Sequence, residues 1–73
     1  METFETYVAP RIAELESYLR AMPRRIAYSI ERDDFVRVQR LADAALEAQD
    51  RLLDLRSLEG QPDSVILGHL AML

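Results

Sequence analysis

The second half of the chain carries the longest regular pattern of apolar residues. Residues 33–59 contain no Gly or Pro, and their apolar residues recur every three or four positions, which is typical of one side of an α-helix. A first row consists of Val38, Leu41, Ala45, Ala48, Leu52 and Leu55. A second row beside it consists of Phe35, Ala42, Leu46 and Leu53. The two rows cover an arc of roughly 200°, about twice the usual apolar width of a surface helix. We therefore expect a long helix over residues 34–59 that packs against partners on two sides.

The first half of the chain predicts two shorter helices. Residues 9–22 show apolar residues at helical spacing. Pro23 is expected to end this helix, because the residue before a proline disfavours the α conformation. Residues 24–31 then form a short second helix, or alternatively continue the first one with a kink at the proline.

The N-terminal segment is ambiguous between strand and helix. Residues 1–8 combine residues of high β propensity with an apolar spacing that also fits a helix. We interpret them as an arm that packs through Phe4 and Tyr7. A helix that began within this segment should bend at Pro10.

The helix ends are marked by capping residues. Asp33 is expected to cap the long helix, since its carboxylate can accept hydrogen bonds from free amide groups of the first turn. Gly60 fits the position just past the end of that helix. Residues 64–72 predict a last short helix that is apolar nearly all round and carries no acidic or basic charge apart from His69. Such a tail should cover the second side of the long helix or dock on another chain.

These elements predict an all-α fold in a single domain, residues 1–73. We expect a helical hairpin that is completed into a small bundle of three to four helices with one long central helix. The chain has 73 residues and no Cys, so disulfides cannot stabilise it. No apolar run approaches the length of a membrane span, and the N-terminus lacks the features of a signal peptide. A cytoplasmic location is therefore expected, with no membrane contact.

Charge divides the chain into three parts. All nine basic residues are Arg, and the net charge is −4. Residues 17–40 carry six Arg against three acidic residues, whereas both flanking segments are acidic. A hairpin would gather the arginines nearest its turn at one end, where clustered guanidinium groups suit the recognition of carboxylate or phosphate. The alternative is that neighbouring acidic residues (Glu16, Glu31, Asp33 and Asp34) pair with these arginines.

Catalytic and metal chemistry find little support in the sequence. The only His is His69, in the apolar tail, and no Ser stands in a recognisable nucleophile motif. Asp43, Glu47, Asp50 and Asp54 line one helix face, but no Glu-x-x-His pair accompanies them as in carboxylate metal sites of helical bundles. We predict no enzyme activity, no catalytic residues, no metal site and no cofactor.

The residues that we expect to bind a partner belong to two groups. Arginines and tyrosines near the turn supply charge and amphipathic aromatic surface, which are frequent at protein interfaces. Two polar residues inside the apolar arc of the long helix could face a guest helix. The candidates are Arg20, Arg24, Arg25, Arg32, Tyr18, Tyr28, Gln49 and Arg56.

Part of the chain resembles a known class of small helical proteins. Phe35, Gln39, Ala45, Leu46, Glu47 and Ala48 lie in a longer helix after a turn that opens with Asp. This layout looks broadly like the helical-hairpin chaperones of bacteria, such as the needle chaperones of type III secretion. The resemblance covers about twenty-five residues and implies a hairpin that holds another helix. In size and acidity the chain also resembles small phage-encoded proteins that bind a host machine.

Three function classes follow in order of preference. The first is a non-catalytic helical regulator, an inhibitor or adaptor that docks on a larger protein machine such as a transcription complex. The second is a chaperone of a secretion-type partner helix. The third is a nucleic-acid-binding regulator that uses the arginines, which the negative net charge disfavours. The partner is expected to be another protein or a second copy in a homodimer.

Overall fold

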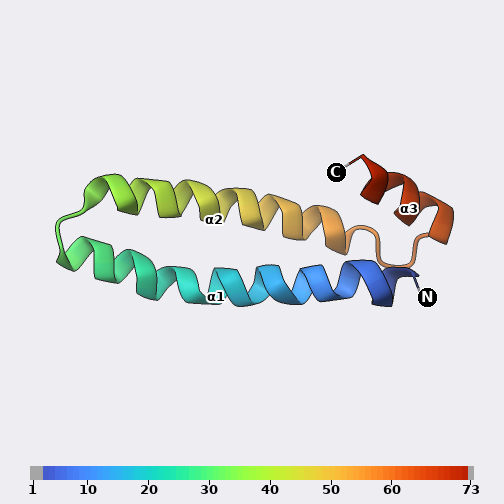
Figure 1. Cartoon of the computed structure of the whole chain (residues 1–73), viewed down its shortest axis with the longest axis horizontal. Coiled ribbons are helices and arrows are strands. Elements are labelled where there is room, and N and C mark those ends of the chain that lie inside the picture. The colour runs from blue at the N-terminus through green and yellow to red at the C-terminus, as the bar shows by residue number, and fades with distance from the viewer. Residues whose placement is uncertain (1–2, 73) are drawn as a thin grey trace.

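The structure, a computed structural model, describes residues 3–72 as an antiparallel helical hairpin with a short helix at its open end (Figure 1). The elements in chain order are η1 (Phe4–Val8), α1 (Ala9–Glu31), α2 (Phe35–Arg56) and α3 (Asp63–Ala71). The predicted all-α class is confirmed. The long helix is not central, however, because α1 and α2 are two arms of similar length, and the molecule is 48 Å long.

Pro23 does not end the first helix, and the prediction of separate helices over residues 9–22 and 24–31 is wrong, whereas the alternative, that residues 24–31 continue the first helix, is confirmed. α1 runs through the proline. Pro23 lies on an exposed part of α1, while Met22 and Ser29, on either side of it in sequence, are buried. A proline inside a helix costs about 3 kcal/mol through a lost hydrogen bond and a steric clash. Packing of α1 along α2 on both sides of Pro23 offsets this cost.

The predicted N-terminal arm is also wrong over the part that the structure describes. Residues 4–8 form a π-helical turn that leads directly into α1, and the Ala9 N–H donates to the Phe4 carbonyl. The wider i→i−5 spacing accommodates Pro10, which has no N–H to donate. Phe4 packs against the core as expected, whereas Tyr7 is exposed.

The tight turn between α1 and α2 is built by two adjacent acidic residues. Asp33 adopts a left-handed conformation with φ of 56°. The N–H of Asp33 donates to the Ile30 carbonyl, and the N–H of Asp34 donates to the Ser29 carbonyl. This is the Schellman pattern that closes a helix. Asp33 therefore ends α1, and the prediction that it caps the long helix is wrong; Asp34 is the cap, and its carboxylate accepts the Arg37 N–H at 3.2 Å.

The open end of the hairpin holds the main apolar core. α2 ends at Arg56, three residues before the predicted boundary, and a turn closed by Gly60 with φ of 80° follows it. The turn places Leu58 in a cluster of buried side chains from η1, α2, the turn itself and α3, against which partly buried residues of α1 pack. This cluster consists of Val8, Leu55, Leu58 and Ile66. Ile66 and the partly buried Leu70 fix α3 to the hairpin end.

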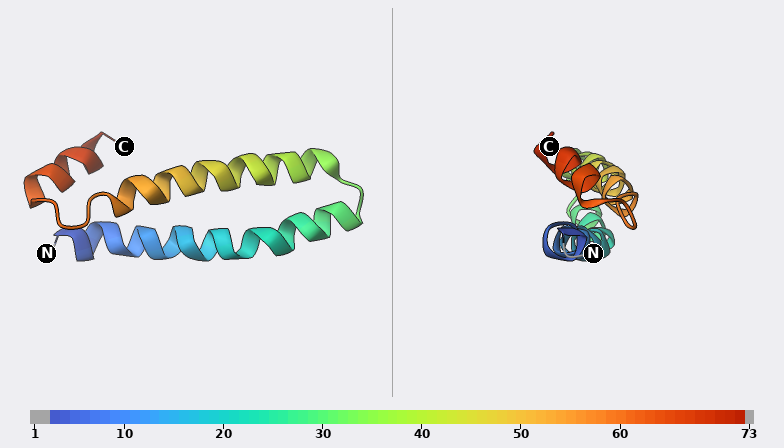
Figure 2. Two further views of the ribbon diagram at one scale, coloured as in Figure 1. Left: turned by 180° about the vertical axis from the view of Figure 1, so that it is seen from behind. Right: turned by 90° about the vertical axis from the view of Figure 1, so that its right-hand side faces the viewer.

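The tail helix does not cover the second apolar row of the long helix, so the first of its two expected roles is wrong, and docking on another chain stays a prediction. Seen end-on in Figure 2, α3 lies to one side of α2 at the open end of the hairpin. The first row is the packing seam, where Ala48, Leu52 and Leu55 are buried. In the second row Leu46 and Leu53 remain 61% and 57% exposed. Packing within the single chain therefore buries one of the two apolar rows of α2 and leaves the other exposed.

Candidate protein-binding surface

The side chains next to the packing seam give the hairpin two broad faces of different chemistry. Successive residues of a helix are about 100° apart, so residues on either edge of the seam emerge on opposite faces. On one face, arginines and tyrosines of α1 meet arginines of α2 across shallow hollows, and we call this the arginine face. It comprises Arg11, Tyr18, Arg24, Arg25, Tyr28, Arg32, Arg37 and Arg51.

The turn end of the arginine face holds four of the predicted binding residues, which together with Arg37 we call the turn-end cluster. Arg24, Arg25 and Tyr28 line a hollow of about 300 Å³ together with Arg37 of α2. The Arg32 guanidinium lies 4.6 Å from the centroid of the Tyr28 ring. At this distance the cation and the ring attract each other, and the aromatic face restricts the motion of the guanidinium.

A fifth predicted residue, Tyr18, extends the cluster toward the middle of the hairpin. The Arg25 guanidinium lies 5.9 Å from the centroid of the Tyr18 ring. Tyr18 also borders the hollow at the open end of the same face. Arg25 therefore links the two hollows.

No carboxylate among residues 3–72 forms an ion pair with the arginines of the cluster. Within residues 3–72 there is one ion pair, between Arg56 and Glu16. Glu16 is thus used elsewhere, and no described acidic residue pairs with Arg24, Arg25 or Arg32. The charge of these arginines remains available to a ligand or partner.

Three predicted residues lie away from the cluster. Arg20 is exposed and points about 160° away from Tyr18 around α1. Gln49 is exposed on α2, about 120° around that helix from Arg37. Arg56 donates to a Glu16 carboxylate oxygen at 2.7 Å on the other side of the hairpin. The structure therefore separates Arg20, Gln49 and Arg56 from the other five candidates.

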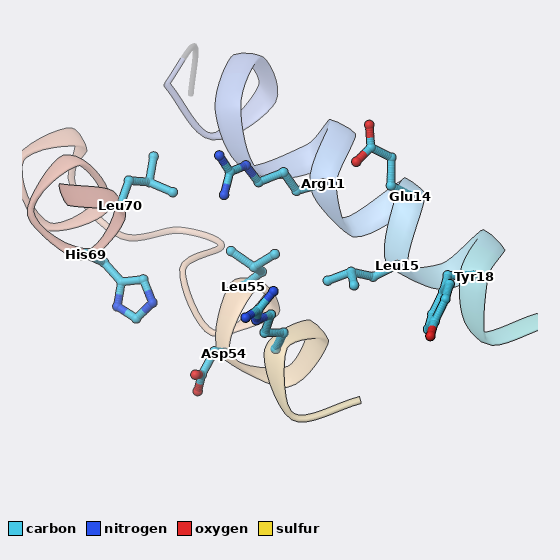
Figure 3. A pocket seen from close by; sticks show the side chains of 9 residues that line it. Arg11, Glu14, Leu15, Tyr18, Asp54, Leu55, His69 and Leu70 are labelled. Carbon is cyan, nitrogen blue, oxygen red and sulfur yellow. The ribbon is translucent and has the colours of Figure 1, made fainter. Parts of the chain in front are cut away.

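A larger hollow of about 710 Å³ opens at the other end of the arginine face, where α3 folds over the hairpin (Figure 3). Arg11 and Glu14 of α1, Arg51 and Asp54 of α2, and His69 of α3 contribute its polar lining. The two arginines and two carboxylates balance in charge. Nε2 of His69 is buried without a hydrogen-bond partner.

The sequence patterns did not predict this hollow. Its residues come from three elements that lie far apart along the chain, and no local motif connects them. Arg37 was likewise missed as a member of the turn-end cluster. The signal that could have found it is its place in the first turn of α2, directly after the tight connection.

The opposite face of the hairpin is apolar. The Arg56–Glu16 pair joins α2 to α1 and marks this side of the molecule. Two rows of apolar residues lie within about 80° of these two positions around their helices, and we call them the apolar face. It comprises Ile12, Leu19, Pro23 and Ile30 of α1 and Phe35, Ala42, Leu46 and Leu53 of α2.

Other kinds of site find no support in the part of the chain that the structure describes. No helix in residues 3–72 is long and apolar enough to cross a membrane. No three His, Asp or Glu side chains of this range gather where they could hold one metal ion.

Comparisons of the chain with protein-family models, with curated proteins and with solved structures gave no match. The function is therefore argued from the two faces of the hairpin.

Proposed function

We propose that this chain is a non-catalytic protein-binding regulator that docks through its arginine face on an acidic surface of a larger cytoplasmic protein. An inhibitor or an adaptor of a macromolecular machine, such as a transcription complex, fits this description. The observation that carries the proposal is the turn-end cluster, in which Arg24, Arg25 and Arg32 lie beside tyrosines and have no carboxylate partner among residues 3–72.

The chemistry of the cluster favours carboxylates of a folded partner. A guanidinium donates two parallel hydrogen bonds to a carboxylate, and stacking on an aromatic ring fixes its plane beforehand. The Arg32 guanidinium lies 4.6 Å from the Tyr28 ring centroid and the Arg25 guanidinium lies 5.9 Å from the Tyr18 ring centroid, both within the range of cation–π attraction. Tyr and Arg are also the residue types that most often dominate binding energies at protein interfaces. The rigid helix beneath them reduces the entropy that is lost on binding.

A charge-matched comparison tests this proposal. The double variant Arg25→Gln, Arg32→Gln removes two cluster charges, and the control variant Arg20→Gln, Arg56→Gln removes two charges outside the cluster. Each chain is immobilised, and proteins captured from an extract of the source cells are quantified by mass spectrometry. We expect the cluster variant to lose specific partners that the control retains. Equal capture by both variants would refute the arginine face as the docking site.

The same variants test whether nucleic acid is the ligand. Binding of DNA or RNA at low salt that falls steeply as salt rises, and that the cluster variant abolishes, would replace the protein partner by a phosphate backbone. The acidic residues of the open end disfavour this outcome, because they repel phosphate.

A chaperone of a partner helix is the second candidate, and the exposed apolar face favours it. A guest helix would lie along Leu46 and Leu53, with Gln49 beside it. This function predicts that the free chain is unstable and that a guest stabilises it. A free chain that unfolds cooperatively with a stable monomeric baseline would argue against it.

A further inference from the structure

We propose that the apolar face is covered by a second copy of the same chain, arranged antiparallel to the first, so that two hairpins form a four-helix bundle. This inference goes beyond the proposed function, which uses the opposite face. It rests on four observations: the exposure of the face, its size, the spacing of its residues and the distribution of charge along the hairpin.

The exposure of the apolar face is large for a chain of this size. Phe35 is 63% exposed, and Leu46 and Leu53 are similarly exposed. Ile30 of α1 adds a half-exposed side chain on the same face. Large contiguous apolar patches on small proteins mark interaction surfaces. The pair of charges on this face, Glu16 and Arg56, is already neutralised within the chain.

The size of the face is that of a small, reversible interface. Each apolar row spans 18 residues, or about 27 Å at about 1.5 Å per residue, and the molecule is 19 Å across its two helices. The face therefore measures roughly 500 Å² per copy, or about 1,000 Å² for two copies, which is the lower limit for a specific interface. α3 lines the hollow of the arginine face through His69 and Leu70, so it does not obstruct the apolar face.

The residues of the face are spaced symmetrically along both helices. The α2 row, Phe35, Ala42, Leu46 and Leu53, has intervals of seven, four and seven residues. The α1 row, Ile12, Leu19, Pro23 and Ile30, has the same intervals. Each row therefore reads the same in both directions, with its centre near the middle of its helix.

This symmetry suits pairing with an antiparallel copy. A twofold axis that lies in the interface and crosses both helices places α2 against α2 of the partner, and α1 against α1 of the partner. Phe35 then faces Leu53 of the second copy, and Ala42 faces its Leu46. Large residues meet at the ends of the row, and small residues meet large ones near the axis, as close packing requires.

Charge selects the antiparallel arrangement over the parallel one. The turn half of the hairpin, residues 20–46, carries six Arg and four acidic residues. The open half, residues 3–19 and 47–72, carries three Arg and eight acidic residues. A parallel pair lays the two acidic open halves side by side, whereas an antiparallel pair keeps them at opposite ends of the bundle. Repulsion between like charges of this kind excludes the wrong arrangement of an interface.

The first test is the mass of the full chain in solution, measured by sedimentation over a wide range of concentration. We expect reversible dimers. Leu46→Glu should raise the dissociation constant by more than about tenfold, since it places a carboxylate against the partner near the axis. Val36→Glu is the matched control, because Val36 is equally exposed but lies outside the apolar face, and it should leave the dimer intact. Monomers at every concentration, or equal effects of both variants, would overturn the proposal.

Orientation is tested by cross-linking, which the absence of native Cys makes simple. A mixture of Phe35→Cys and Leu53→Cys chains should form a mixed disulfide dimer under oxidation, and neither variant alone should cross-link efficiently. Efficient linkage of Phe35→Cys with itself would indicate that the turn ends lie together and would refute the antiparallel arrangement. Capture experiments with Leu46→Glu separate this inference from the proposed function. Loss of the dimer should not reduce partner binding through the arginine face. The dimer and the proposed docking site can therefore each be refuted without the other.

Discussion

Two adjacent leucines in α2 offer the sharpest test of how the hairpin is held together. Leu52 is 6% exposed and lies on the seam against α1, whereas Leu53 is 57% exposed and lies on the apolar face. Substitution of each by Ala changes the same atoms and the same helix propensity at neighbouring positions. Only the surroundings of the side chain differ.

The expected magnitudes follow from burial. Leu52→Ala removes buried methyl groups and leaves a cavity between the helices, which costs about 2–5 kcal/mol. Leu53→Ala in the isolated chain loses contacts on less than half of its side-chain surface, so its cost should stay below about 1 kcal/mol. A domain of this length has a total stability of roughly 4–11 kcal/mol, so the first substitution removes a large part of it.

Thermal unfolding followed by circular dichroism measures the difference. The experiment is performed at a protein concentration where sedimentation shows monomers, since dimerisation would add stability to the chain with intact Leu53. A difference of 2 kcal/mol corresponds to a fall in Tm of roughly 8–16 °C for a chain of this size. Similar losses for both variants, or a larger loss for Leu53→Ala, would refute the assignment of the seam and with it the division of the hairpin into two faces.

Three further experiments test local features of the fold by denaturant unfolding. Asp34→Ala should lower the free energy of unfolding by about 1 kcal/mol through loss of the cap. Asp33→Gly should raise it by up to about 1 kcal/mol, because Gly adopts the left-handed conformation without a penalty. Changes in the same direction would contradict the different roles of these two residues in the turn. Pro23→Ala should raise the free energy of unfolding by about 1–3 kcal/mol if α1 is continuous there, and a loss would restore the predicted break. A double-mutant cycle of Glu16→Gln and Arg56→Gln should give a coupling below about 1 kcal/mol, because both side chains are partly solvated; a larger coupling would mean that the pair is shielded from water.

The sequence predicted the long helix and its seam well, because the pattern repeats over six turns. Ala48, Leu52 and Leu55 are buried as the first apolar row requires. The width of the apolar arc led us to expect neighbours on two sides of this helix, and within the described chain only the first row is packed, while Leu46 and Leu53 remain exposed. The neighbour on the second side could not be predicted. An apolar pattern within one helix indicates that a surface is buried, but it does not identify the element that covers it.

The errors arose where tertiary packing outweighs a local preference. The intrinsic cost of Pro23 is real, yet burial along α1 exceeds it, and no single-helix rule contains that comparison. Asp33 and Asp34 have the same side chain, which is favoured as the N-cap of a helix. Their roles are decided by where α1 closes its last turn, which fixes the left-handed conformation on Asp33.

The candidate site was predictable in part for the same reason. The turn gathers Arg24, Arg25, Tyr28 and Arg32 because they lie close together in sequence near the end of one helix. Arg37 joins them only through the geometry of the connection. The hollow beneath α3 depends on the position of the tail, which the sequence did not specify.

The two proposed interfaces together restrict how a partner can be bound. A twofold axis in the plane of the apolar face directs the two arginine faces away from each other. Antiparallel pairing also displaces the two turn-end clusters in opposite directions along the bundle, each by about 5–17 Å from the axis, because their residues lie a few turns from the centres of the apolar rows. Since the clusters lie on opposite faces of the bundle, one partner molecule would have to pass around it to reach both.

The dimer should therefore bind two partner molecules, one on each arginine face, rather than one partner molecule through both faces. We expect complexes of two copies of this chain with two partners, and complexes of one copy with one partner for Leu46→Glu. The mass of the purified complex by light scattering distinguishes the two. A complex of two copies with a single partner molecule would show that the arginine faces lie on the same side, which is incompatible with an axis that lies in the apolar interface.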